Sequence, residues 1–86
     1  MFEVLIISPF AHALEKQTAE VKRQLFLDDV MDYNIHEVKA LPDELDGKLD
    51  GKQYDFMYID VNYIASEVNA MREHLNGLQS KQIVRF

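Results

Sequence analysis

The chain has no cysteine, which excludes disulfides and thiolate chemistry, so covalent catalysis would need another nucleophile. It has no apolar run near the ~18 residues that cross a bilayer, and residues 1–3 lack the basic start of a signal peptide. Acidic residues outnumber lysine and arginine 15 to 9, for a net charge of −6. Because a spanning run and a signal peptide are both missing, we expect a cytoplasmic protein without membrane contact. Because phosphate binding needs a basic face, we expect no direct contact with nucleic acid.

The composition is typical of a folded domain, with 48% hydrophobic and 28% charged residues. We predict that residues 1–86 form a single domain. A domain of this size buries only roughly 60–65% of its unfolded surface, so its stability is modest. We therefore expect a partner or further domains of a parent chain.

Four segments are predicted to be strands. Residues 2–7 are almost continuously apolar, which is typical of a central strand of a parallel sheet. A loop marked by Asp32-Tyr33-Asn34 precedes residues 35–39, whose many polar side chains suit an edge strand. Residues 54–60 place aromatic side chains on one face and aliphatic ones on the other, and residues 83–86 form the fourth strand.

Three segments are predicted to be helices. Residues 11–27 have an amphipathic pattern, and a short acidic helix follows Pro42 and ends before Gly51. The third helix has the clearest apolar stripe, with Asn76-Gly77 as a stop or as a weak point within its last turn. That stripe consists of Ile64, Val68, Met71, Leu75 and Leu78.

The alternation of strands and helices predicts an α/β fold, a small three-layer sandwich with helices on both faces of a four-stranded parallel sheet. Because crossovers are right-handed, we predict the strand order 2-1-3-4. Ligands in such sheets bind at the carboxyl ends of the strands where the order reverses. A site would therefore use Ser8 to Ala13 and residues 60–63.

The first strand ends at Ser8, where loop amides and a helix N-terminus could hold a phosphate. However, Pro9 has no N–H group and Phe10 is bulky, so a plain structural turn is the favoured interpretation. His12 could accept a phosphoryl group or act as a base, but it has no serine, cysteine or second acid beside it in a catalytic pattern. A solvent-facing or helix-capping histidine is the favoured interpretation.

Asp60 stands where a phosphoaccepting aspartate would stand, at the carboxyl end of a central strand. It also suits the cap region of the following helix. A phosphoacceptor needs Mg²⁺ held by further carboxylates, and the first strand supplies none. His36 and His74, on a predicted strand and helix, lack the spacing of metal ligands. We therefore expect no metal and no cofactor.

Taken together, these segments resemble the EIIB domains of the bacterial sugar phosphotransferase system. The similarity lies in the Val4-to-Ser8 strand, the helix to Leu25, Leu41-Pro42-Asp43-Glu44-Leu45, the 54–60 strand, and Val61-Asn62-Tyr63-Ile64. In that family a phosphocysteine ends the first strand and a loop of small residues follows it. The resemblance implies that the equivalent loop here is Ser8, Pro9, Phe10, Ala11, His12 and Ala13, with Ser8 in the place of cysteine.

EIIB-like domains without cysteine occur at the C-terminus of Mga-like and AtxA-like virulence transcription regulators. This resemblance implies a non-catalytic regulatory and dimerisation domain, cut from a larger regulator. One alternative is a degenerate response-regulator receiver that signals through protein contacts, with Asp60 as phosphoacceptor. Another is a sugar-transport phosphocarrier that uses Ser8 or His12.

The chain also has a surplus of aromatic residues for one small core, which predicts that a partner buries some of them. These residues are Tyr33, Tyr54, Tyr58, Tyr63 and Phe86. The last strand is expected to be a sheet edge, and uncovered edges invite pairing. We expect a homodimer, through a helix face or this edge; the alternative is a monomer whose edge the parent chain covers.

Overall fold

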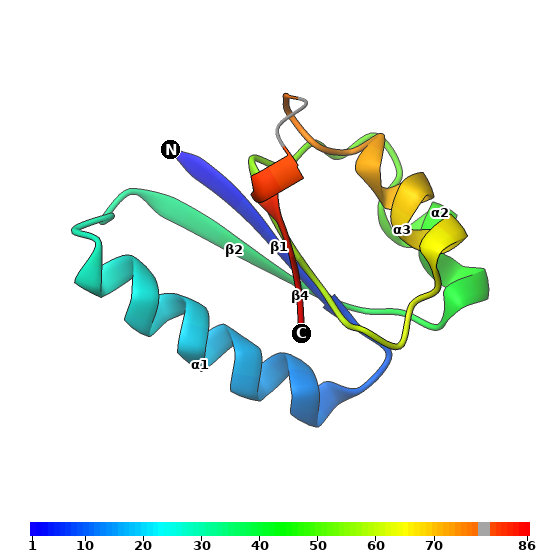
Figure 1. The fold of residues 1–86 in the computed structure, drawn as a ribbon, viewed down its shortest axis with the longest axis horizontal. Coiled ribbons are helices and arrows are strands. Elements are labelled where there is room, and N and C mark those ends of the chain that lie inside the picture. Colours follow the sequence, from blue (N-terminus) through cyan, green and yellow to red (C-terminus); the bar gives the residue numbers. More distant parts are fainter. Residues whose placement is uncertain (78–79) are drawn as a thin grey trace.

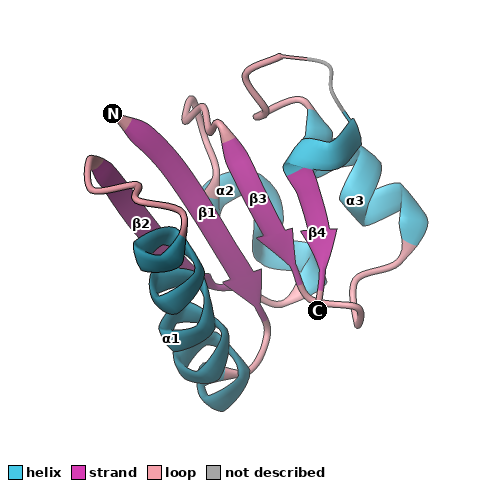
Figure 2. Ribbon diagram, turned by 60° about the vertical axis from the view of Figure 1, so that its left-hand side comes forward, coloured by secondary structure: helices cyan, strands magenta, loops and turns pink. Residues whose placement is uncertain are grey.

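The structure is a computed structural model that describes residues 1–77 and 80–86. Its sheet has four parallel strands in the order β2-β1-β3-β4, as the sequence predicted (Figure 2). The strands are β1 (Phe2–Ser8), β2 (Tyr33–Lys39), β3 (Phe56–Ile59) and β4 (Ile83–Arg85). The apolar β1 is central and the polar β2 is an edge, while β4 forms the opposite edge.

Helices cover both faces of the sheet, which confirms the three-layer, Rossmann-like α/β architecture (Figure 1). The helix α1 (Ala11–Leu27) packs on β1 and β2 from one side. The short η1 (Pro42–Glu44), α2 (Leu45–Lys48) and α3 (Ala65–Arg72) lie on the other side, and η2 (Ser80–Gln82) leads into β4. No helix of the described residues is long and apolar enough to span a membrane.

Each face of the sheet has its own core. The α1 side buries Val4, Ile6, Leu14 and Val21, with Phe56 and Tyr58 packed beside them. The larger core on the α3 side contains Leu5, Ile7, Ala40, Leu45, Leu49, Tyr54, Met57, Ile59, Tyr63, Val68, Met71 and Leu75. Within β3, Phe56 and Tyr58 thus face α1 while Met57 and Ile59 face α3, as the alternation predicted. The prediction was wrong for Tyr54, which precedes β3 and lies in the core on the α3 side.

The predicted extent of the third helix was wrong at both ends. Ile64 precedes α3 and is 63% exposed, and the helix ends at Arg72, so His74 lies beyond it. Leu75 is buried through a bridge to Tyr54, in which Tyr54 N–H donates to the His74 carbonyl and Asn76 N–H to the Tyr54 carbonyl. These bonds replace a further helical turn. Leu78 lies outside the described residues.

Two further predictions are corrected. Tyr33 and Asn34 belong to β2 and not to a loop, because Phe2 and Glu3 of β1 pair with them. Tyr54 and Tyr63 are only 1% exposed and fill the chain's own core, so they are not available to a partner. Of the aromatic residues named above, Tyr33, Tyr58 and Phe86 are the ones left half-buried.

Candidate functional site

The predicted rim brings Ser8 and Asp60 together. Ser8 is the last residue of β1 and Asp60 directly follows β3, the neighbouring strand. The Ser8 hydroxyl donates to Asp60 Oδ2 at 2.6 Å. Both residues are buried, with Ser8 0% and Asp60 3% exposed. The hydroxyl therefore points into the molecule, toward a carboxylate, and not toward solvent.

The second oxygen of the Asp60 carboxylate is also hydrogen-bonded. Its Oδ1 accepts hydrogen bonds from the backbone N–H of Asn62 at 2.7 Å and from the Asn62 side-chain amide at 2.8 Å. Burial alone would raise the pKa of Asp60. The hydrogen bonds from Ser8 and Asn62 and the nearby charge of Arg85 outweigh burial and hold this pKa below its usual value. Asp60 is thus an ionised structural carboxylate.

Arg85 fixes the loop that carries Asp60. Its guanidinium donates to the carbonyls of Ile59 at 3.2 Å, Asp60 at 3.0 Å and Tyr63 at 2.8 Å. Tyr63 is anchored in turn, because its hydroxyl donates to the Ala40 carbonyl at 2.6 Å. Burial, followed by the charge of Asp60, raises the pKa of Tyr63 far above its usual value. The sequence did not single out Arg85, since its role depends on β4 lying beside β3.

The loop after β1 is a structural turn. Ser8 Oγ accepts a hydrogen bond from the Phe10 N–H at 3.0 Å, which closes the loop against α1. Pro9 and Ala13 are half-buried, whereas Phe10, Ala11 and His12 are exposed. Among the described residues, no hydrogen bond joins His12 to Ser8 or Asp60. The structure therefore brings Ser8 and Asp60 together and leaves His12 apart from them.

Two of the helices that begin at this rim, η1 and α3, carry their own acidic caps, whereas α1 has no acidic residue in its first turn. The Leu41 N–H donates to Glu44 and the Ile64 N–H donates to Glu67, each at 2.8 Å. Each glutamate therefore occupies the place where an anionic ligand would meet the helix N-terminus. These caps could have been predicted from the sequence, because each glutamate follows the residue whose N–H it accepts from by three positions.

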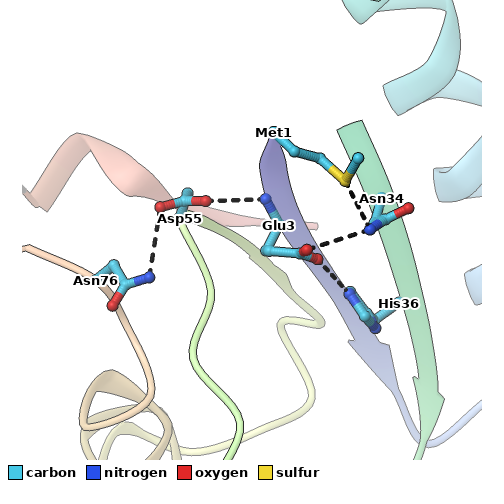
Figure 3. A network of polar contacts seen from close by, with 6 residues as sticks. All are labelled: Met1, Glu3, Asn34, His36, Asp55 and Asn76. Atoms are coloured by element: carbon cyan, nitrogen blue, oxygen red, sulfur yellow. Dashed lines mark hydrogen bonds and ion pairs between the residues drawn. The ribbon is translucent and has the colours of Figure 1, made fainter. Parts of the chain in front are cut away.

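A second polar cluster, which the sequence did not predict, lies at the amino end of the sheet (Figure 3). Glu3 accepts from Asn34 at 3.2 Å and pairs with His36 Nε2 at 2.6 Å. These contacts, led by the hydrogen bond with His36, lower the pKa of Glu3. The Glu3 N–H also donates to Asp55, and the His36 ring lies edge-on to Tyr54 with centroids 5.4 Å apart. Side chains from β1, β2 and the segment before β3 are thereby joined.

Neither cluster has the composition of a metal centre. Within residues 1–77 and 80–86, no three His, Cys, Asp or Glu side chains are grouped so that they could hold an ion. His74, which the sequence placed apart from His36, instead contacts the Lys52 carbonyl through Nδ1 at 2.9 Å.

No model of a protein family, no curated protein and no solved structure matches this chain. The resemblance to EIIB domains is therefore still a prediction from the residues. Function has to be inferred from the geometry of the rim and of the surfaces around it.

Proposed function

We propose that this chain is a non-catalytic regulatory and dimerisation domain of a bacterial transcription regulator linked to the sugar phosphotransferase system, similar to the cysteine-less EIIB domains. The observation that carries the proposal is the closed rim. Ser8, in the place of the phosphocysteine, is fully buried and donates its only proton to Asp60. A side chain that accepts a phosphoryl group from a carrier protein must be accessible to that carrier, and the Ser8 hydroxyl is not accessible.

The chemistry of the pair supports the same proposal. A general base works best with a pKa near the operating pH, but the pKa of Asp60 is lowered. Asp60 is thus a poor base for the Ser8 hydroxyl. Its own use as a phosphoacceptor would require breaking the hydrogen bonds from Ser8 and Asn62. The arrangement favours a rim that stabilises the fold.

The surroundings of the rim favour protein contact. The exposed apolar side chains that follow β1, β2 and β3 are Phe10, Leu41, Val61 and Ile64, which are 53–63% exposed. The two sheet edges also differ. The β2 edge carries Asn34, Glu37 and Lys39, which discourage pairing, whereas β4 presents Val84 at 41% exposure. A dimer through a helix face or the β4 edge would cover such groups.

Sedimentation equilibrium of the chain at micromolar concentrations tests this association. We expect a mass that rises from monomer toward dimer with concentration, and we expect Val84→Lys to shift the equilibrium toward monomer. Val61→Lys is the matched control, since it also replaces an exposed valine but lies outside the sheet. A strictly monomeric mass over the whole range would refute self-association.

The degenerate receiver is the second candidate, because Asp60 does lie at the carboxyl end of β3. Incubation with acetyl phosphate and Mg²⁺ separates the two functions. The regulatory domain proposed here takes up no phosphate under these conditions. Modification that is lost in Asp60→Asn would establish the receiver instead.

A further inference from the structure

Within the described residues, one half of a sheet face has no helix over it. The helix α1 packs on β1 and β2, and Figure 2 shows β3 and β4 uncovered beside it. The opposite face of the sheet is covered by α2 and α3. Parallel sheets normally have both faces buried, so this uncovered half is a surface suited to a further helix.

Two mainly apolar hollows lie along α1 on this side of the sheet. At the carboxyl end of the strands, a hollow of about 480 Å³ is lined by Phe10, Ala13 and Phe86. At the amino end, a second hollow of about 160 Å³ is lined by Phe2, Phe56 and Tyr58. We call these two hollows and the surface between them the α1 groove. Aromatic side chains of this kind are enriched where proteins contact one another.

The dimensions of the α1 groove suit one helix. A helix laid beside α1 would cover β3 and β4, which together are roughly 10 Å wide, and a helix with its side chains is roughly 10–12 Å across. The other half of the same face shows that one helix can cover two strands, because α1 alone covers β1 and β2. A docked helix as long as α1, which has 17 residues, would span both hollows.

The charges along the groove indicate the orientation and the charge pattern of a helix that would bind there. In α3, Glu67 lies in the first turn and Arg72 in the last, which suits the helix dipole. In α1 this pattern is missing: no acid lies in the first turn, no base lies in the last, and Asp28 follows the helix. His12 and Lys16 line the groove at the positive end of α1, and Asp28 lines it at the negative end. Dipole and side chains thus reinforce each other at both ends.

We propose that the α1 groove binds one amphipathic α-helix of a partner protein, antiparallel to α1, with basic residues in its first turn and acidic residues in its last. Its negative end would lie near His12 and Lys16, and its positive end near Asp28. A second copy of this chain offers no such helix, because α1 and α3 already turn their apolar sides toward their own sheet. The helix α1 buries Leu14 and Val21, and α3 buries Val68 and Met71. This proposal does not depend on the regulatory role proposed above.

A synthetic peptide of 17 residues, the length of α1, provides the probe. It carries a leucine and alanine stripe at helical spacing, lysine in its first turn and glutamate in its last. We expect saturable shifts of the groove amides in spectra of the ¹⁵N-labelled chain. A spin label at the peptide's C-terminus should broaden the amides of His12 and Lys16, and a label at its N-terminus those of Asp28 and Phe56. The opposite pattern would overturn the proposed orientation.

Matched variants test the groove itself. Ala13→Arg fills the groove, whereas Ala19→Arg adds the same side chain on the exposed face of α1. We expect only Ala13→Arg to abolish peptide binding. Lys16→Glu should weaken binding about threefold, because a charge near a helix end contributes ~0.3–1 kcal/mol. Lys22→Glu should not, because Lys22 is exposed and is not among the residues that line the two hollows.

Three outcomes would overturn the proposal. The first is equal binding of a peptide with the same composition and no apolar stripe. The second is equal loss of binding in both members of a variant pair. The third is a dimer that Ala13→Arg dissociates and Ala19→Arg does not, which would show that a second copy fills the groove.

Discussion

Replacing Ser8 with alanine removes two interactions at the closed rim. The first is the buried hydrogen bond from the hydroxyl to the ionised Asp60, and hydrogen bonds to charged groups contribute ~1.5–3 kcal/mol. The second is the hydrogen bond that the Phe10 N–H donates to Ser8 Oγ, which contributes about 1 kcal/mol. Asp60 keeps both hydrogen bonds from Asn62, so its carboxylate is still solvated by the protein. We therefore expect Ser8→Ala to lower the free energy of unfolding by about 2.5–4 kcal/mol.

Urea unfolding followed by circular dichroism measures this loss. In a domain of this size, 1 kcal/mol corresponds to roughly 4–8 °C in melting temperature, so thermal unfolding should show a large shift as well. Ser66→Ala is the matched control, because Ser66 is exposed on α3 and makes no hydrogen bond through its side chain among the described residues. A loss of less than ~0.5 kcal/mol in Ser8→Ala, within the range of ordinary surface substitutions, would refute the structural role of the rim.

Two further predictions concern stability. The Tyr54 hydroxyl is buried with no hydrogen-bond partner among the described residues, whereas the Tyr63 hydroxyl donates to the Ala40 carbonyl. We therefore expect Tyr54→Phe to stabilise the chain by about 1 kcal/mol and Tyr63→Phe to destabilise it by about 1 kcal/mol. Equal effects of the two variants in chemical unfolding would contradict this difference. Because the pKa of Asp60 is lower in the folded than in the unfolded chain, its contribution to stability is present above about pH 4 and is lost as the pH falls through the folded pKa. The free energy of unfolding should fall less steeply below pH 4 in Asp60→Asn than in the parent chain, and identical slopes would show that Asp60 is not specially stabilised.

The sequence predicted the sheet well because burial acts directly on its strands. The apolar β1 could lie only in the centre, and the polar residues of β2 required an edge. The right-handed crossover rule then left one order of strands. Side-chain alternation in β3 was equally readable, since the period of a strand fixes which residues share a face.

Features that depend on contacts between distant residues could not be predicted. The apolar spacing at Leu75 suits a helix, but the bridge to Tyr54 draws this residue toward the sheet instead. At the rim, topology placed Ser8 and Asp60 at the same edge, yet the contacts of Arg85 with the loop after β3 come from a distant strand and could not be read from the pattern. The sequence pattern therefore located the candidate site and did not show that it is closed.

The most direct test of a non-catalytic domain is the intact mass of the chain after incubation with the phosphorylated carrier proteins of the sugar phosphotransferase system. A cysteine-containing EIIB domain in the same reaction shows that the carriers are competent. We predict that this chain keeps its original mass while the control gains a phosphoryl group. A stable phosphoprotein that disappears in Ser8→Ala or His12→Ala, with the variant still folded, would contradict the account.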